Sequence, residues 1–272
     1  MKNIFKSREK LVALLIFIGI TALFVWDYVL APFNELANAI IVNGATVLSA
    51  LIVAVILTRI TFYFHPKEAP FLIWAAFSVG MWLWAIAEAI WGYLYTTAGE
   101  VPVFSAADVL WFMGYIALTI SLVRQYRLVF FNQVYTIRWA AFGIWMGILL
   151  SIETILLVTH SEAPLEDFFR YFYVIADTMV GLSAGYLVYA FRGRALAIPW
   201  LTISSFVVTD ILYISLTNTG AYDWVMSGVS IALVADTLYL VAYFIVAWGV
   251  LGQYILLKTS SDHSQPEPVT PN

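Results

Sequence analysis

Apolar residues run in long stretches that short polar segments separate, and the pattern repeats from end to end of the chain. An α-helix rises 1.5 Å per residue, so a stretch of about 20 apolar residues crosses the roughly 30 Å hydrocarbon core of a bilayer. Eight stretches have this length, at roughly 11–31, 38–58, 70–95, 107–124, 139–159, 171–190, 197–216 and 229–256. The pattern predicts an all-α integral membrane protein with eight transmembrane helices.

Composition agrees with this class. Hydrophobic residues make up 62% of the chain and charged residues 11%, a balance far from that of soluble domains. Membrane lipid is therefore an expected partner. The absence of cysteine excludes disulfides, thiolate metal sites and a cysteine nucleophile.

The basic residues predict the orientation. The sequence has 13 lysines and arginines, and Arg170 is the only one that the eight spans place on the second side. The other twelve flank the spans on one side: Lys2, Lys6, Arg8, Lys10, Arg59, Lys67, Arg124, Arg127, Arg138, Arg192, Arg194 and Lys258. The positive-inside rule makes that side cytoplasmic. We expect a plasma-membrane protein with both termini in the cytoplasm.

Two segments resemble each other closely. The stretch 107–115 aligns with 235–243 at a constant offset of 128 residues, and each begins with Ala-Asp. Weaker pairs are Asn43 with Asp177 and Glu88 with Asp210. Four spans per half would insert both halves in the same direction, which predicts two parallel four-helix repeats. The expected division is 1–128, 129–258 and a disordered cytoplasmic tail, 259–272.

Acidic residues lie within or at the edge of the spans, and the predicted orientation places each in the outer half of its helix. A carboxylate at mid-membrane costs about 2.5–3.5 kcal/mol, so such groups face the bundle interior or water, or carry a proton. They are Asp27, Glu88, Asp108, Glu153, Asp177, Asp210 and Asp236. Two have simpler interpretations: Asp108 follows Ser105 by three residues, as in a capping box, and Asp27 would suit the wet interface.

Aromatic residues recur beside these acids at helical spacing. Asp236 shares a helix face with Tyr239, Asp210 with Tyr213, and Asp108 with Trp111. A tyrosine hydroxyl or indole N–H can donate to a carboxylate. The candidate ligand-binding residues are Glu88, Asp108, Asp177, Asp210, Asp236, Trp91, Tyr213 and Tyr239. An interfacial aromatic belt and simple hydrogen bonds between helices remain alternatives.

Other chemistries find little support. His65, His160 and His263 lie outside the predicted spans, and no span contains a lysine for a retinal Schiff base. The chain has no phosphate-binding glycine-rich motif, and its basic residues are too scattered for a nucleic-acid surface. The sequence contains no activated nucleophile that would indicate an enzyme, although paired carboxylates could do acid–base work. The sequence specifies no cofactor and no metal, although Asp, Glu and Asn43 oxygens would suit a hard cation.

One segment resembles a known pattern. Glu88-Ala-Ile-Trp91-Gly-Tyr93, followed by Pro102, Ser105, Ala107-Asp108, Trp111 and Gly114-Tyr115, is similar to multi-helix membrane sensor regions. Those regions stand at the N-termini of bacterial and archaeal signalling proteins, ahead of PAS, histidine-kinase or diguanylate-cyclase modules. The resemblance implies sensing across the membrane. The chain ends soon after the last span, so we expect no output domain.

The sequence therefore favours a receptor-like or sensory membrane protein with an outward-facing acidic and aromatic pocket for a cation, a proton or a small cationic ligand. The expected protein partner is a cytoplasmic signalling protein or a larger membrane complex. Two alternatives stay open: a cation- or proton-coupled transporter, and a structural subunit that holds lipid or pigment.

Overall fold

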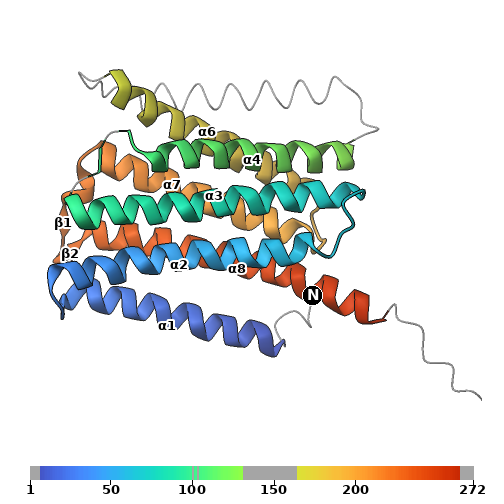
Figure 1. Cartoon of the computed structure of the whole chain (residues 1–272), viewed down its shortest axis with the longest axis horizontal. Helices are drawn as coiled ribbons and strands as arrows, with labels where there is room; N and C mark the ends of the chain where they lie inside the picture. The colour runs from blue at the N-terminus through green and yellow to red at the C-terminus, as the bar shows by residue number, and fades with distance from the viewer. Residues whose placement is uncertain (1–6, 100, 103, 131–163, 264–272) are drawn as a thin grey trace, which may run out of the picture.

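The structure, a computed structural model, describes residues 7–99, 101–102, 104–130 and 164–263. These residues form a bundle of long helices that lie side by side (Figure 1). The long helices are α1 (Arg8–Leu30), α2 (Glu35–Thr61), α3 (Ala69–Ala98), α4 (Ala106–Phe130), α6 (Pro164–Ala190), α7 (Ala197–Asn218) and α8 (Ile231–His263). Within the described ranges, seven helices are long and apolar enough to cross a membrane. The chain is thus an all-α multi-pass membrane protein, and the predicted span 139–159 lies outside the described residues.

Local signals in the sequence set several helix ends. The Asn34 side chain accepts a hydrogen bond from the Ala37 N–H at 2.9 Å and so caps the start of α2. Helix α3 carries Pro70 in its first turn and ends at Gly99, whose φ of 76° suits a residue without Cβ. Helix α8 continues to His263, beyond its predicted end. Residues 259–263, which the sequence predicted to be disordered, are therefore helical.

The connection between α7 and α8 has structure that the sequence analysis did not predict. A 3₁₀ turn, η2 (Ala221–Asp223), precedes an antiparallel hairpin of β1 (Val225–Met226) and β2 (Val229–Ser230). The two turn residues, Ser227 and Gly228, have φ of 53° and 82°, as tight hairpins require. Strands of two residues are too short to give an alternating pattern. This connection holds η2 against the first turns of α8.

Packing between helices is tight where small residues face each other. A Cβ added to Gly80 would lie 3.2 Å from the Gly114 carbonyl oxygen, so α3 and α4 approach closely at this pair of glycines. Farther along the bundle, Phe77 clusters with two buried indoles, with ring centroids 6.3 Å from Trp74 and 5.8 Å from Trp200. These side chains belong to one continuous hydrophobic core.

The neighbours of each helix are those that two parallel repeats would produce. Helix α3 packs on α4 as α7 packs on α8, α2 packs on α3 as α6 packs on α7, and α2 meets α8 as α6 meets α4. Asp108 and Asp236, which the repeat aligns, both lie in the first turns of their helices. The repeat stays a prediction, because one of its eight spans lies outside the described residues.

The start of α1 and the end of α8 lie at the same end of the bundle. The Lys258 ammonium group donates to the Glu9 carboxylate at 2.9 Å and joins the two helices there. Arg59 and Arg127 occupy the last turns of α2 and α4, and therefore lie at this end too. Which side of the membrane this end faces remains the prediction of the positive-inside rule.

Candidate functional site

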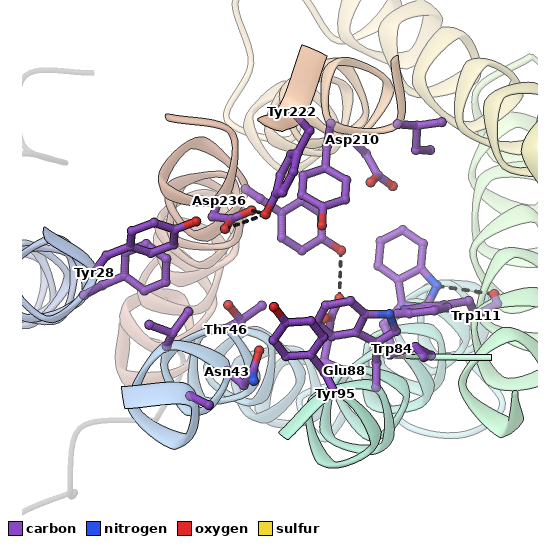
Figure 2. A pocket seen from close by; sticks show the side chains of 18 of the residues that line it. Tyr28, Asn43, Thr46, Trp84, Glu88, Tyr95, Trp111, Asp210, Tyr222 and Asp236 are labelled. Atoms are coloured by element: carbon purple, nitrogen blue, oxygen red, sulfur yellow. Dashed lines mark hydrogen bonds between the residues drawn. The ribbon is translucent and has the colours of Figure 1, made fainter. Parts of the chain in front are cut away.

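A cavity of about 720 Å³ occupies the end of the bundle opposite Lys258 and Glu9. Residues of all seven long helices in the described ranges line it, together with Tyr222 of η2. Figure 2 shows these side chains pointing toward one another from α1, α2, α3, α4, α7 and α8. The volume lies within the range of about 300–1,000 Å³ that small-molecule sites have.

Carboxyl groups are the chemical feature of this cavity. Five acidic side chains line it: Asp27, Glu88, Asp108, Asp210 and Asp236. No lysine, arginine or histidine is among the described residues of its wall. Negative charge in the cavity therefore has no basic partner in the described wall, where the other polar groups belong to tyrosine, tryptophan, threonine and asparagine.

Tyrosine hydroxyls satisfy several of the carboxyls. Glu88 accepts hydrogen bonds from Tyr239 at 2.7 Å and from Tyr243 at 2.8 Å, so α8 donates twice to α3. Both Asp236 oxygens lie 2.9 Å from the Tyr222 hydroxyl. Burial raises the pKa of the Tyr222 phenol above its ordinary value, which keeps this hydroxyl protonated and able to donate.

Asp108 combines the two roles that the sequence suggested for it. Its Oδ2 accepts from the Ser105 backbone N–H at 2.7 Å and from the Ser105 hydroxyl at 2.9 Å, which makes it part of a capping box at the start of α4. Its Oδ1 accepts from the Tyr173 hydroxyl of α6 at 2.6 Å. The same carboxyl thus closes a helix end and forms part of the cavity wall.

Asp177 was predicted to be a ligand-binding residue, but it does not line the cavity. It is 0% exposed, and its Oδ1 accepts from the Tyr115 hydroxyl at 2.6 Å, while Tyr115 itself lines the cavity. The carboxyl group of Asp210 lies beside it. Asp177 therefore supports the wall from behind, since the Tyr115 ring occupies the position nearer the cavity.

Asp27 is the unsatisfied member of the set. Its side chain is 1% exposed, and neither carboxyl oxygen has a hydrogen-bond partner in the part of the chain that the structure describes. Asp27 faces the bundle interior and lines the cavity, and the suggestion that it lies at the level of the wet interface stays a prediction. A buried carboxylate without a donor is costly.

Aromatic rings form much of the wall between these acids. Trp91 stacks on Tyr95 with ring centroids 5.3 Å apart, and the Trp84 indole N–H donates to the Trp111 carbonyl at 3.4 Å. Tyr213 packs against Tyr239 at 5.5 Å. The alternative of an interfacial belt suits other rings, such as Trp224, which is 60% exposed and outside the cavity.

Aromatic side chains also fill the bundle below the cavity. Phe206 of α7 lies with its ring centroid 5.2 Å from Trp84 and 4.8 Å from Tyr243. Ten residues before Trp84 on α3, about 15 Å along the helix, Trp74 and Phe77 begin the stacked layer with Trp200. The cavity thus ends on a packed core.

The structure brings together seven of the eight predicted site residues in the wall of one cavity: Glu88, Asp108, Asp210, Asp236, Trp91, Tyr213 and Tyr239. Three residues that donate to or face these acids were not predicted from the sequence: Tyr28, Tyr173 and Tyr222. Tyr28 directly follows Asp27, and Tyr173 precedes Asp177 by one helical turn, so their spacing from acidic residues could have identified both. Tyr222 lies in a loop and had no such signal.

A metal centre has no support here. Among the described residues, no group of three or more His, Asp or Glu side chains is placed to hold a metal ion. Asp108, Asp236 and Glu88 each have their own tyrosine donor, so their oxygens do not converge on one point.

Comparisons of this chain with models of protein families, with curated proteins and with solved structures found no match. The resemblance to membrane sensor regions therefore stays a prediction from the residues that carry it.

The buried pair of Tyr115 and Asp177 yields a prediction about stability. Tyr115→Phe should lower the free energy of unfolding by about 1–2 kcal/mol, because it removes the hydroxyl donor from a carboxyl that is 0% exposed. Thermal unfolding of the purified protein in nanodiscs would measure the loss. The matched control is Tyr93→Phe on α3, where the side chain is 68% exposed and no change is expected. Equal melting temperatures for the two variants would contradict the prediction.

Proposed function

We propose that this protein is a receptor-like membrane protein whose cavity binds a small organic cation from the outer side of the membrane. One observation carries the proposal. Five carboxyl side chains line a single cavity that has no lysine, arginine or histidine among its described wall residues. A positively charged ligand would supply the positive charge that the described wall of the cavity lacks.

Asp27 supports a cation specifically. Both of its oxygens lack a protein donor within the described residues, although the side chain is almost completely buried. A positive group bound beside it would compensate its charge inside a medium of low dielectric constant, where such pairing is strong. The aromatic walls add to this, since the faces of Trp84, Trp91 and Tyr95 attract cations.

The geometry favours an organic cation over a metal ion. A bare metal ion needs several oxygens converging at about 2–2.5 Å, and the tyrosine-bound carboxyls are dispersed around the wall instead. A cavity of about 720 Å³ suits a molecule of many atoms. Ammonium groups in such a molecule would reach Asp27, and its apolar parts would contact the rings.

The packed aromatic layer favours reception over transport. A transporter needs a path to the other side, and Phe206, Trp74 and Trp200 fill the bundle below the cavity. All seven long helices described contribute to the cavity wall, so a ligand would contact every one of them. A ligand that prefers one arrangement of these helices would shift the population toward it, and a partner at the opposite end could respond.

Choline and 3,3-dimethylbutan-1-ol test the proposal, because they share shape and hydroxyl group and differ in charge. We expect choline to raise the melting temperature of the nanodisc-embedded protein and the uncharged alcohol to leave it unchanged. At 100 times its dissociation constant, choline would stabilise the folded state by about 2.7 kcal/mol. Equal effects of the two compounds, or no effect of either, would overturn the cation site. Uptake of choline by proteoliposomes would replace the receptor with a transporter.

A further inference from the structure

A second hollow, of about 490 Å³, lies on the outside of the bundle between α2 and α3. Its wall is mostly apolar and combines small and large residues, and no charged residue lines it. Its main members are Leu36, Ile40, Gly44, Leu48, Gly92 and Tyr93. We call it the α2–α3 groove.

The groove faces the hydrocarbon of the membrane. Leu36, Ile40 and Leu48 are 57%, 56% and 46% exposed, and they belong to a helix that is long and apolar enough to cross a bilayer. The lining of the groove extends along α2 from Leu36 to Leu51, a rise of about 22 Å. One leaflet contributes about 15 Å of hydrocarbon, so the groove is long enough to hold an extended alkyl chain.

Asn43 joins the groove to the acidic cavity. Its side chain belongs to the walls of both hollows, and its amide donates to the Thr96 hydroxyl across α2 and α3 at 3.2 Å. In Figure 2, Asn43 and Thr46 project from α2 toward the acidic and aromatic side chains. Gly92 of α3 packs closely against Asn43, since a Cβ there would lie 3.0 Å from the Asn43 Cβ.

From this adjacency we infer that the ligand is an amphiphilic cation, with its charged head in the cavity and its alkyl chain in the α2–α3 groove. The inference rests on the proposed function and adds the substrate class to it. The two hollows have complementary chemistry, because carboxyls line one and only apolar groups and a few hydroxyl and amide groups line the other. The alkyl chain would pass between α2 and α3, which requires the Asn43 side chain to move away from the Thr96 hydroxyl.

Gly44 permits a direct test of the groove. A Cβ added there would meet no atom within 4 Å, so a leucine side chain would enter open space in the groove without a clash. The matched control is Gly19→Leu on α1, where a Cβ also meets nothing within 4 Å and which is not part of the groove wall. Both changes replace an exposed helical glycine with a better helix former, so folding is preserved.

The probes are tetramethylammonium and octyltrimethylammonium, titrated into the nanodisc-embedded variants. Octyltrimethylammonium should bind Gly44→Leu at least tenfold more weakly than it binds Gly19→Leu, while tetramethylammonium binds both equally. Partition of the octyl chain into lipid is the same for both variants and cancels in the comparison. Equal octyl affinities would overturn the groove and leave the cation site standing. Failure of both probes to bind any variant would instead count against the proposed function.

Discussion

Replacing Asp27 with asparagine is expected to weaken choline binding at least a hundredfold, without lowering the stability of the unliganded protein. The two effects separate because of what surrounds the carboxyl. No described residue donates to either oxygen, so removing the charge breaks no hydrogen bond within that part of the protein. It also removes the cost of a buried, unpaired carboxylate, so the melting temperature should stay the same or rise.

Choline affinity should fall because the substitution removes the negative charge that would pair with the bound cation. Truncating one partner of a buried charge pair costs about 2–5 kcal/mol, and a hundredfold change corresponds to about 2.7 kcal/mol. Isothermal titration of choline into the two proteins would measure it. Asp223→Asn is the control, since Asp223 is an exposed acid of η2, close in sequence to Tyr222 but outside the cavity wall. If Asp27→Asn binds choline as the wild type does, Asp27 does not contact the cation.

Asp236→Asn would give a less informative result. Both Asp236 oxygens lie within hydrogen-bond distance of the Tyr222 hydroxyl, so the substitution disturbs the connection between α7 and α8 as well as the charge. A loss of binding there would have two explanations. Asp27 offers the cleaner experiment because its environment lacks such a donor.

Gly114→Ala is expected to lower the free energy of unfolding by about 3 kcal/mol, a large effect for one methyl group. The new Cβ would lie 2.4 Å from Cδ1 and 2.5 Å from Nε1 of the Trp84 indole. Trp84 is 2% exposed and packs on Tyr115 and Phe206, so moving the ring would disturb both contacts. Either this ring or helices α3 and α4 would have to shift, and overpacking of this kind is costly.

Gly19→Ala provides the control for glycine replacement as such. A Cβ at Gly19 meets no atom within 4 Å, so alanine should keep or raise the melting temperature by improving helix propensity. Thermal unfolding of the two variants in the same nanodiscs would show the opposite signs. A Gly114→Ala protein as stable as Gly19→Ala would mean that α3 and α4 do not pack as closely as the structure has them.

The helices were predictable because their signal is dense and local. Twenty consecutive apolar residues leave little choice in a bilayer, where every backbone polar group must be bonded within its own helix. The predicted span 70–95 lies inside α3 (Ala69–Ala98), and the predicted span 197–216 lies inside α7 (Ala197–Asn218). The hairpin between β1 and β2 was missed, because four residues in two strands carry no periodicity.

The sequence predicted which residues belong to the candidate site, but not which of them contact one another. Helical spacing placed Tyr239 near Asp236 on α8, yet the Tyr239 hydroxyl donates to Glu88, 151 residues away in the sequence. Spacing along one helix shows which side chains share a face, but not which neighbouring helix that face meets. Asp177 illustrates the same limit, because its burial behind Tyr115 depends on how α4 and α6 pack.

By itself, the sequence determined that this is a multi-pass helical membrane protein with acids placed in its spans, because burial of apolar residues in lipid depends on local composition alone. The tertiary structure decided which acids share a cavity, which of them tyrosines satisfy, and that Asp27 is left without a donor among the described residues. These outcomes depend on contacts between helices far apart in the chain. The shapes of packed side chains and the distances between helices fix these contacts, and neither can be read from the sequence of a single segment.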